Sequence, residues 1–169
     1  MSTVLATPRL LVRQFTTADV DPLHLLCGDR RTMRYVGDGM VLDRQRCAEW
    51  IDECRASYAA GRAGGWALEL HDQPGLAGYA GITSARRRAD PELIYLIRRD
   101  RWGQGLASEL VPALIDHGFN ALGAKRLVAT VRPENVASVR VLEKSGMHCA
   151  GEEYAAEGIL MLIYALDRQ

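Results

Sequence analysis

Two glycines, Gly103 and Gly105, lie between a strand-like run and a helix-like run, and this junction constrains the fold more than any other stretch of the chain. The run Glu92–Ile97 has the composition of a strand. After the glycines, apolar residues recur at steps of three and four: Leu106, Leu110, Val111, Leu114, Ile115, Phe119 and Leu122. This order predicts a strand, a tight turn and a helix.

A turn of this kind can bind an anion. The first N–H groups of a helix have no intrahelical partner and carry the positive end of the helix dipole, and glycines leave them accessible. Glycine loops also precede helices for purely steric reasons, so the turn alone is weak evidence. Arg98, Arg99 and Arg101 add positive charge beside it, although each also fits a solvated charged loop.

A second informative stretch predicts another strand, turn and helix. The strand is Arg126–Val131, the turn is Arg132–Glu134, and a helix follows that is capped by Asn135 and ends before Gly146. Asn135 is a favoured N-cap residue, and Gly146 is suited to the left-handed position after a helix. Asn135 is therefore either a structural cap or a ligand contact.

The remaining elements follow from periodicity and turn residues. We expect a helix to begin at Thr16–Asp19 and another to cover Asp43–Ala60. The predicted strands are Arg9–Gln14, Trp66–His71, Ala77–Ser84, Met147–Glu152 and Gly158–Leu166, with a turn at Asp72–Gly75 and a linker at Arg86–Pro91.

Pro112 falls within the helix that follows the glycine turn. Proline lacks the N–H that a helix interior needs, but the first turn of a helix tolerates it. We therefore expect the regular helix to begin near Ser108.

Length and charge are consistent with one domain over residues 1–169. The 21 basic and 21 acidic residues balance, so no overall field attracts nucleic acid or an acidic membrane. No apolar run approaches the roughly 20 residues that span a bilayer, and we expect a cytoplasmic protein.

The cysteines and histidines do not form a metal-binding pattern. Cys27, Cys47, Cys54 and Cys149 show no CxxC spacing, which favours reduced, partly buried thiols. The four histidines are scattered, and we expect no metal.

Taken together, the two informative stretches resemble the GNAT superfamily of acetyl-CoA-dependent N-acetyltransferases. The segment Trp102–Ala107 resembles the pyrophosphate-binding motif A, and Asn135–Met147 resembles the family's following segment. Thr7–Arg13 and Asp29–Tyr35 are similar to the RimJ/RimL-type branch, whose best-known members acetylate protein N-termini. Trp102 departs from the Gln or Arg common in motif A and marks the branch, whereas Ile94 stands where that branch often has glycine.

The resemblance implies an α/β (α+β) fold, in which a mixed, mostly antiparallel sheet is flanked by helices. Its central strands, Glu92–Ile97 and Arg126–Val131, are expected to splay and form a slot for the pantetheine arm of acetyl-CoA. The pyrophosphate would rest on the amides of Gly103–Ala107. The implied cofactor-binding residues are Leu96, Ile97, Arg98, Arg99, Arg101, Trp102, Gly103, Gln104, Gly105, Leu106, Ala107, Ser108, Asn135 and Ser138.

Attack of an amine on a thioester requires a neutral nucleophile, a stabilised oxyanion and help for the departing thiolate. Glu92 and Glu69 are the candidate bases, although solvent-facing charge explains either one in an alternating strand. A backbone N–H near Ile97 is the expected oxyanion donor. Ser138 stands where the branch places a serine beside the CoA sulfur. It is either the proton donor or a polar residue of the first helical turn.

The function implied by the resemblance is acetyl transfer to a primary amine, with a peptide or protein N-terminal α-amine as the favoured acceptor. The alternatives are a small amine (a polyamine, an aminoglycoside or an amino acid) and a module that binds acetyl-CoA without catalysis. A homodimer is left open.

Overall fold

The computed structural model describes residues 2–84, 89–155 and 158–169. Its strands are β1 (Thr3–Ala6), β2 (Leu10–Arg13), β3 (Gly65–Leu70), β4 (Gln73–Ser84), β5 (Pro91–Ile97), β6 (Arg126–Val131), β7 (His148–Tyr154) and β8 (Leu160–Asp167). Its helices are η1 (Thr17–Asp19), α1 (Val20–Cys27), α2 (Arg30–Met33), α3 (Arg44–Ala59), η2 (Arg99–Arg101), α4 (Leu106–Asn120) and α5 (Val136–Lys144).

Within the described residues, eight strands form one sheet in the order β1-β2-β3-β4-β5-β6-β8-β7. Neighbouring strands are antiparallel, except that β5 and β6 are parallel. This arrangement confirms the predicted mixed, mostly antiparallel sheet with flanking helices.

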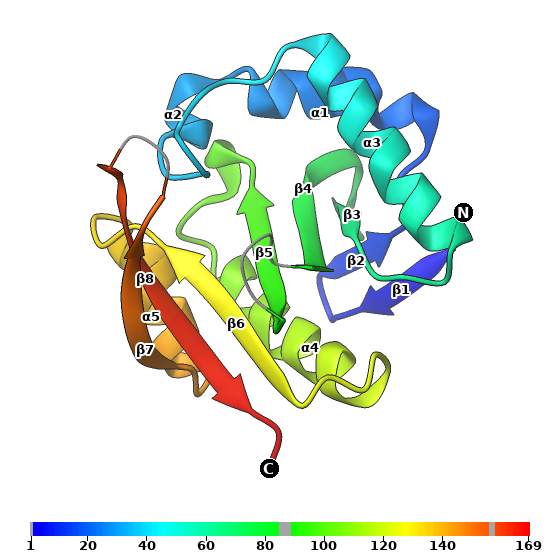
Figure 1. Ribbon diagram of the computed structural model, residues 1–169. Coiled ribbons are helices and arrows are strands. Elements are labelled where there is room, and N and C mark those ends of the chain that lie inside the picture. The colour runs from blue at the N-terminus through cyan, green and yellow to red at the C-terminus, as the bar shows by residue number, and fades with distance from the viewer. Residues whose placement is uncertain (1, 85–88, 156–157) are drawn as a thin grey trace.

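The two parallel strands separate almost as soon as they meet. Their pairing is confined to Glu92 opposite Val128, whereas β5 pairs with β4 from Ser84 opposite Pro91 to Gly78 opposite Ile97. From Glu92 onward β5 and β6 diverge toward their carboxyl ends (Figure 1). The predicted splay is therefore confirmed, in the strands that the sequence indicated.

The sheet separates two apolar cores. Leu93 and Ile97 of β5 belong to the core that includes residues of α4 and α5. Leu96 belongs to the other core, which is built with residues of α1 and α3. Side chains alternate between the two faces of a strand, so β5 contributes to both cores and to both sides of the gap beside it.

Gly78 allows β4 and β5 to approach closely near the end of β5. A Cβ atom placed on Gly78 would lie 2.0 Å from the Leu96 carbonyl oxygen. Because that neighbour is backbone, any larger residue would push the two strands apart. Gly78 therefore helps to set the path of β5 where it leaves β6.

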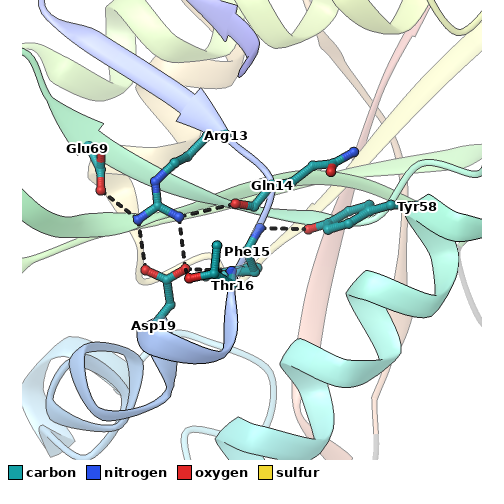
Figure 2. Close-up of polar contacts among 7 residues, drawn as sticks. All are labelled: Arg13, Gln14, Phe15, Thr16, Asp19, Tyr58 and Glu69. Atoms are coloured by element: carbon teal, nitrogen blue, oxygen red, sulfur yellow. Dashed lines mark hydrogen bonds and ion pairs between the residues drawn. The ribbon is translucent and has the colours of Figure 1, made fainter. Parts of the chain in front are cut away.

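A buried ionic cluster joins β2, β3 and the start of the first helical segment (Figure 2). Arg13 Nη1 and Nη2 donate to the two carboxylate oxygens of Asp19, both at 2.8 Å, and Nη2 also donates to Glu69 Oε1 at 2.6 Å. The side chains of Arg13 and Asp19 are 8% and 7% exposed. Thr16 N–H donates to Asp19 as well, at 2.7 Å, so the cluster fixes the chain where it leaves β2.

Several predicted boundaries differ from the structure. β1 was not predicted, and the short α2 lies in a segment for which no helix was expected. The expected helix start near Ser108 is wrong, because α4 begins at Leu106 and holds Pro112 in its interior. Gly105, with φ of 74°, takes the left-handed conformation immediately before the helix and lets it begin at once. Pro91 of the predicted linker belongs to β5, and residues 86–88 of that linker lie outside the described residues.

Replacing Asp19 with asparagine should lower the free energy of unfolding by about 3–5 kcal/mol, because it leaves a buried guanidinium without its main counterion. The control is Asp52→Asn, which breaks an exposed pair with Arg55 and should cost about 0.2–1 kcal/mol. Urea titration of both variants measures the difference. Equal losses in the two variants would contradict a stabilising role for the cluster.

The same pair predicts a dependence of stability on pH. Burial alone would raise the pKa of Asp19, but the hydrogen bonds from Arg13 and Thr16 outweigh it and lower the pKa. A lowered carboxyl pKa stabilises the fold above the unfolded value of about 3.9 and loses this effect as the pH falls through the folded value. The stability difference between the protein and Asp19→Asn should therefore shrink below about pH 4.

Candidate active site

A cavity of about 700 Å³ occupies the gap between β5 and β6. It extends through the sheet, because its walls include Tyr95 and Ile97 from one face of β5 and Glu92 and Leu96 from the other. The N-terminal ends of α4 and α5 also border it. Most of the predicted site residues line this cavity: Glu92, Leu96, Ile97, Arg101, Trp102, Gly103, Gly105, Leu106, Ala107, Ser108, Asn135 and Ser138.

The glycine turn forms one end of the cavity. Gly103 and Gly105 have φ values of 73° and 74°, a left-handed conformation that favours glycine. Through these residues the chain passes from η2 into α4, and neither glycine carries a side chain beside the start of the helix. The first N–H groups of a 15-residue helix follow the turn, and such groups are common anion-binding donors.

The predicted arginines do not all face this turn. Arg101 lines the cavity and hydrogen-bonds to Gln73. Arg98 instead forms a double hydrogen bond with Asp100, at 2.7 and 3.0 Å, and Arg99 lies 3.9 Å from Asp29. Arg98, Arg99 and Gln104 are not among the residues that line the cavity.

Trp102 is hydrogen-bonded to the last residue of β5. Its indole Nε1 donates a hydrogen bond of 2.7 Å to the Ile97 carbonyl, while the residue remains 49% exposed. That carbonyl is therefore occupied within the protein. The sequence placed Trp102 at the site but gave no indication of this contact.

The start of α5 forms the opposite wall. Asn135 Oδ1 accepts a hydrogen bond of 3.3 Å from the Ser138 N–H, which confirms that Asn135 caps the helix. Both residues also line the cavity. The cap holds the first turn of α5 in place, and Ser138 is carried on that turn.

The two candidate bases are in different environments. Glu92 accepts a hydrogen bond of 2.5 Å from Thr130 Oγ1 across the gap between β5 and β6. Glu69 is ion-paired with Arg13 in the cluster described above and lies outside the cavity lining. The structure therefore brings Glu92, but not Glu69, together with the glycine turn and Ser138.

A second cavity, of about 820 Å³, meets the first at Glu92. It lies beside α3 and the ends of β3 and β4, and its lining includes both acidic and basic side chains. Glu92, Ile94, Thr130, Met161 and Gly37 line both cavities. The two cavities therefore adjoin on the Glu92 face of β5, where the strands diverge.

Arg9 and Tyr95 are site features that sequence reasoning missed. Arg9 Nε lies 2.6 Å from Glu109 Oε2, and its Nη1 donates to the Gln104 carbonyl at 2.8 Å, so Arg9 braces the glycine turn. The signal was present in the Thr7–Arg13 segment that resembles the RimJ/RimL-type branch. Tyr95 lines the cavity beside Leu96, and no pattern in the sequence singled it out.

Among the described residues, no group of three or more His, Cys, Asp or Glu side chains could hold a metal ion. Over the same part of the chain, no helix is long and apolar enough to cross a membrane. Cys27, Cys47 and Cys54 are buried, and Cys149 is exposed.

Comparison with known proteins agrees with this geometry. Residues 9–148 match the family model described as acetyltransferase (GNAT) domain. The uncharacterized N-acetyltransferase YoaA of Bacillus subtilis is 31% identical over 152 residues, which cover 89% of this chain and 86% of YoaA. The uncharacterized N-acetyltransferase p20 of Bacillus licheniformis is 30% identical over 166 residues, covering 95% and 92%.

A solved structure shows the same fold with a bound ligand. The ribosomal-protein α-N-acetyltransferase RimL, in complex with coenzyme A, superposes with a TM-score of 0.83 over 98% of both chains, at 18% identity. At 18% sequence identity, the structural similarity supports the fold alone. The family match and the named relatives, by contrast, extend over most of the chain. The protein therefore belongs to the GNAT acetyltransferase family and is an acyltransferase.

Proposed function

We propose that this protein transfers the acetyl group of acetyl-CoA to the α-amine at the N-terminus of a peptide or protein. The observation that carries the proposal is the cavity that passes through the sheet between β5 and β6. The glycine turn and the start of α5 lie on one side of it, and the Glu92–Thr130 pair lies on the other. A thioester and an amine can thus approach each other from opposite faces.

The side that bears α4 and α5 suits the cofactor. The amides of Gly103–Ala107 would hold the pyrophosphate at the positive end of the α4 dipole. Arg98 N–H donates to Ala77 on β4, and backbone groups alternate in direction along a strand. The N–H groups of Tyr95 and Ile97 therefore point away from β4, into the gap, where the pantetheine amides can pair with them.

The other side suits the acceptor. Asp38, Glu53, Glu92 and Glu153 line the second cavity together with Arg46 and Arg62, and Arg46 is ion-paired with Glu53 at 3.0 Å. A polycation would need a wall of unpaired carboxylates. A wide cavity lined by both signs of charge favours the end of a peptide over a polyamine or an aminoglycoside.

The reaction needs a neutral amine at the gap. An α-amine, with a pKa of about 7.7–8.0, is neutral in an appreciable fraction near pH 7, whereas a lysine amine near about 10.4 is almost fully protonated. Glu92 would accept the proton that the amine loses, directly or through one water. A backbone N–H near Ile97 that the pantetheine leaves unpaired would face the developing oxyanion, and Ser138 would hydrogen-bond to the departing thiolate.

The glycine turn gives the first prediction for cofactor binding. Gly105→Val should abolish tight binding of CoA in calorimetric titration, because a β-branched residue resists the left-handed conformation and would cover the helix amides. Gly123→Val is the matched control, since Gly123 has φ of 68° after the end of α4 and open space around it. A folded Gly105→Val variant that binds CoA like the control would contradict the proposed phosphate site.

The two carboxylates give a second prediction. Glu92→Gln should lower kcat by about 10²-fold, at the lower end of the usual range for a lost general base, because an α-amine needs little help. The deficit should narrow as the pH rises through the pKa of the acceptor amine. Glu69→Gln should weaken the ion pair with Arg13 and lower the melting temperature while kcat stays near that of the unmodified protein. The reverse pattern in steady-state kinetics would assign the base to Glu69.

The choice of acceptor gives a third prediction. A peptide with a free α-amine and no lysine should be acetylated with a kcat/KM that rises with an apparent pKa near that of the free amine. Blocking the α-amine should abolish turnover. Equal turnover of an N-terminally blocked peptide that bears only a lysine amine would rule out the proposed acceptor.

A further inference from the structure

Tyr95 has a buried hydroxyl group that the fold leaves unused. Its side chain lies on the face of β5 that carries Leu93 and Ile97 and forms part of the cavity wall. Among the described residues, the Tyr95 hydroxyl oxygen is buried without a hydrogen-bond partner. A buried hydroxyl without a partner costs free energy, so it calls for an explanation.

The Ser138 side chain offers an explanation for this hydroxyl group. It lines the same cavity from the first turn of α5. Tyr95 packs against the core that includes Leu142 of the same helix. Burial raises the pKa of Tyr95, and the neighbouring Ser138 side chain lowers it in part. The two side chains are therefore neighbours in the wall of one cavity.

We propose that Tyr95 is a positioning residue whose hydroxyl, unpartnered in the free protein, donates to Ser138 Oγ when acetyl-CoA occupies the cavity and thereby turns the Ser138 O–H toward the sulfur of the leaving group. The inference rests on the proposed acetyl transfer. A serine hydroxyl rotates freely and, near a helix start, can instead donate to a backbone carbonyl of the preceding turn. A fixed donor on its oxygen leaves the serine proton available for another acceptor.

The step conserves atoms and electrons without moving a proton from Tyr95. When the tetrahedral intermediate collapses, the oxyanion electron pair reforms the carbonyl bond. The C–S bond breaks and its electron pair stays on sulfur. The thiolate accepts a hydrogen bond from Ser138, and solvent protonates it as free CoA. Because its pKa is raised, Tyr95 remains a neutral donor throughout.

The test is a double-mutant cycle on single-turnover acetyl transfer to an α-amine peptide. Tyr95→Phe should slow the chemical step about five- to tenfold, the value of one hydrogen bond. Ser138→Ala should slow it by up to about 10²-fold. The double variant should be no slower than Ser138→Ala, because Tyr95 acts through Ser138. The Kd for acetyl-CoA should stay within about twofold of that of the unmodified protein in each case.

Tyr164→Phe is the matched control. It removes a hydroxyl from another buried tyrosine, one that donates to Glu143 of the same helix α5 at 3.0 Å, and it should transfer acetyl at the unmodified rate. Without acetyl-CoA, Tyr95→Phe should keep or raise the melting temperature, because the hydroxyl that it removes has no partner in the free protein. A purely structural tyrosine would lower it.

Three results would overturn the inference: an unmodified rate in Tyr95→Phe, independent effects that multiply in the double variant, or an equal loss in Tyr164→Phe. If the unmodified protein transfers acetyl to the peptide and Tyr95→Phe does so equally fast, the inference alone fails. If the unmodified protein acetylates no amine of a broad panel, the proposed function and the inference fail together.

Discussion

The confinement of the β5–β6 pairing to Glu92 and Val128 is the constraint on which the site depends. β5 can leave β6 because β4 pairs with it along its length, and β6 can leave β5 because β8 pairs with it from Arg126 to Val131. Each strand thus keeps one partner. The backbone N–H and C=O groups that face the gap have no partner on the neighbouring strand, and buried backbone groups without partners are rare in folded proteins. The divergence therefore creates both a space and a demand for hydrogen bonds.

The helices that follow these strands place functional groups beside the same gap. α4 follows β5 through the glycine turn, and α5 follows β6 through a short turn, so the N-terminal ends of both helices reach the gap. Glu92 lies at the closed end of the gap, where the strands still touch, and there it meets the second cavity. A simple separation of two strands thus places an anion site, a helix-borne hydroxyl and a carboxylate around one passage.

Sequence reasoning succeeded where the determining chemistry is local. Three features can each be recognised within one short segment: the glycines of the turn, the capping by Asn135 and the apolar periodicity of α4. It failed where distant residues decide. From the sequence, Glu69 is indistinguishable from a solvent-facing charge. In the structure, β2 places Arg13, 56 positions away, beside it. The short β1 has no clear alternation and owes its form to pairing with β2. The contact of Trp102 with Ile97 and the unpartnered hydroxyl of Tyr95 likewise exist only in three dimensions.

Residue-resolved hydrogen exchange of the backbone amides of Tyr95 and Ile97 tests the central claim most directly. These amides lie beyond Glu92, the position at which β5 pairs with β6, and they face the gap. The account predicts rapid exchange in the free protein and strong protection on addition of acetyl-CoA, while the amide of Arg98, bonded to Ala77, is protected in both states. Slow exchange of Tyr95 and Ile97 in the free protein, or exchange unchanged by acetyl-CoA, would contradict a cofactor bound between the diverging strands.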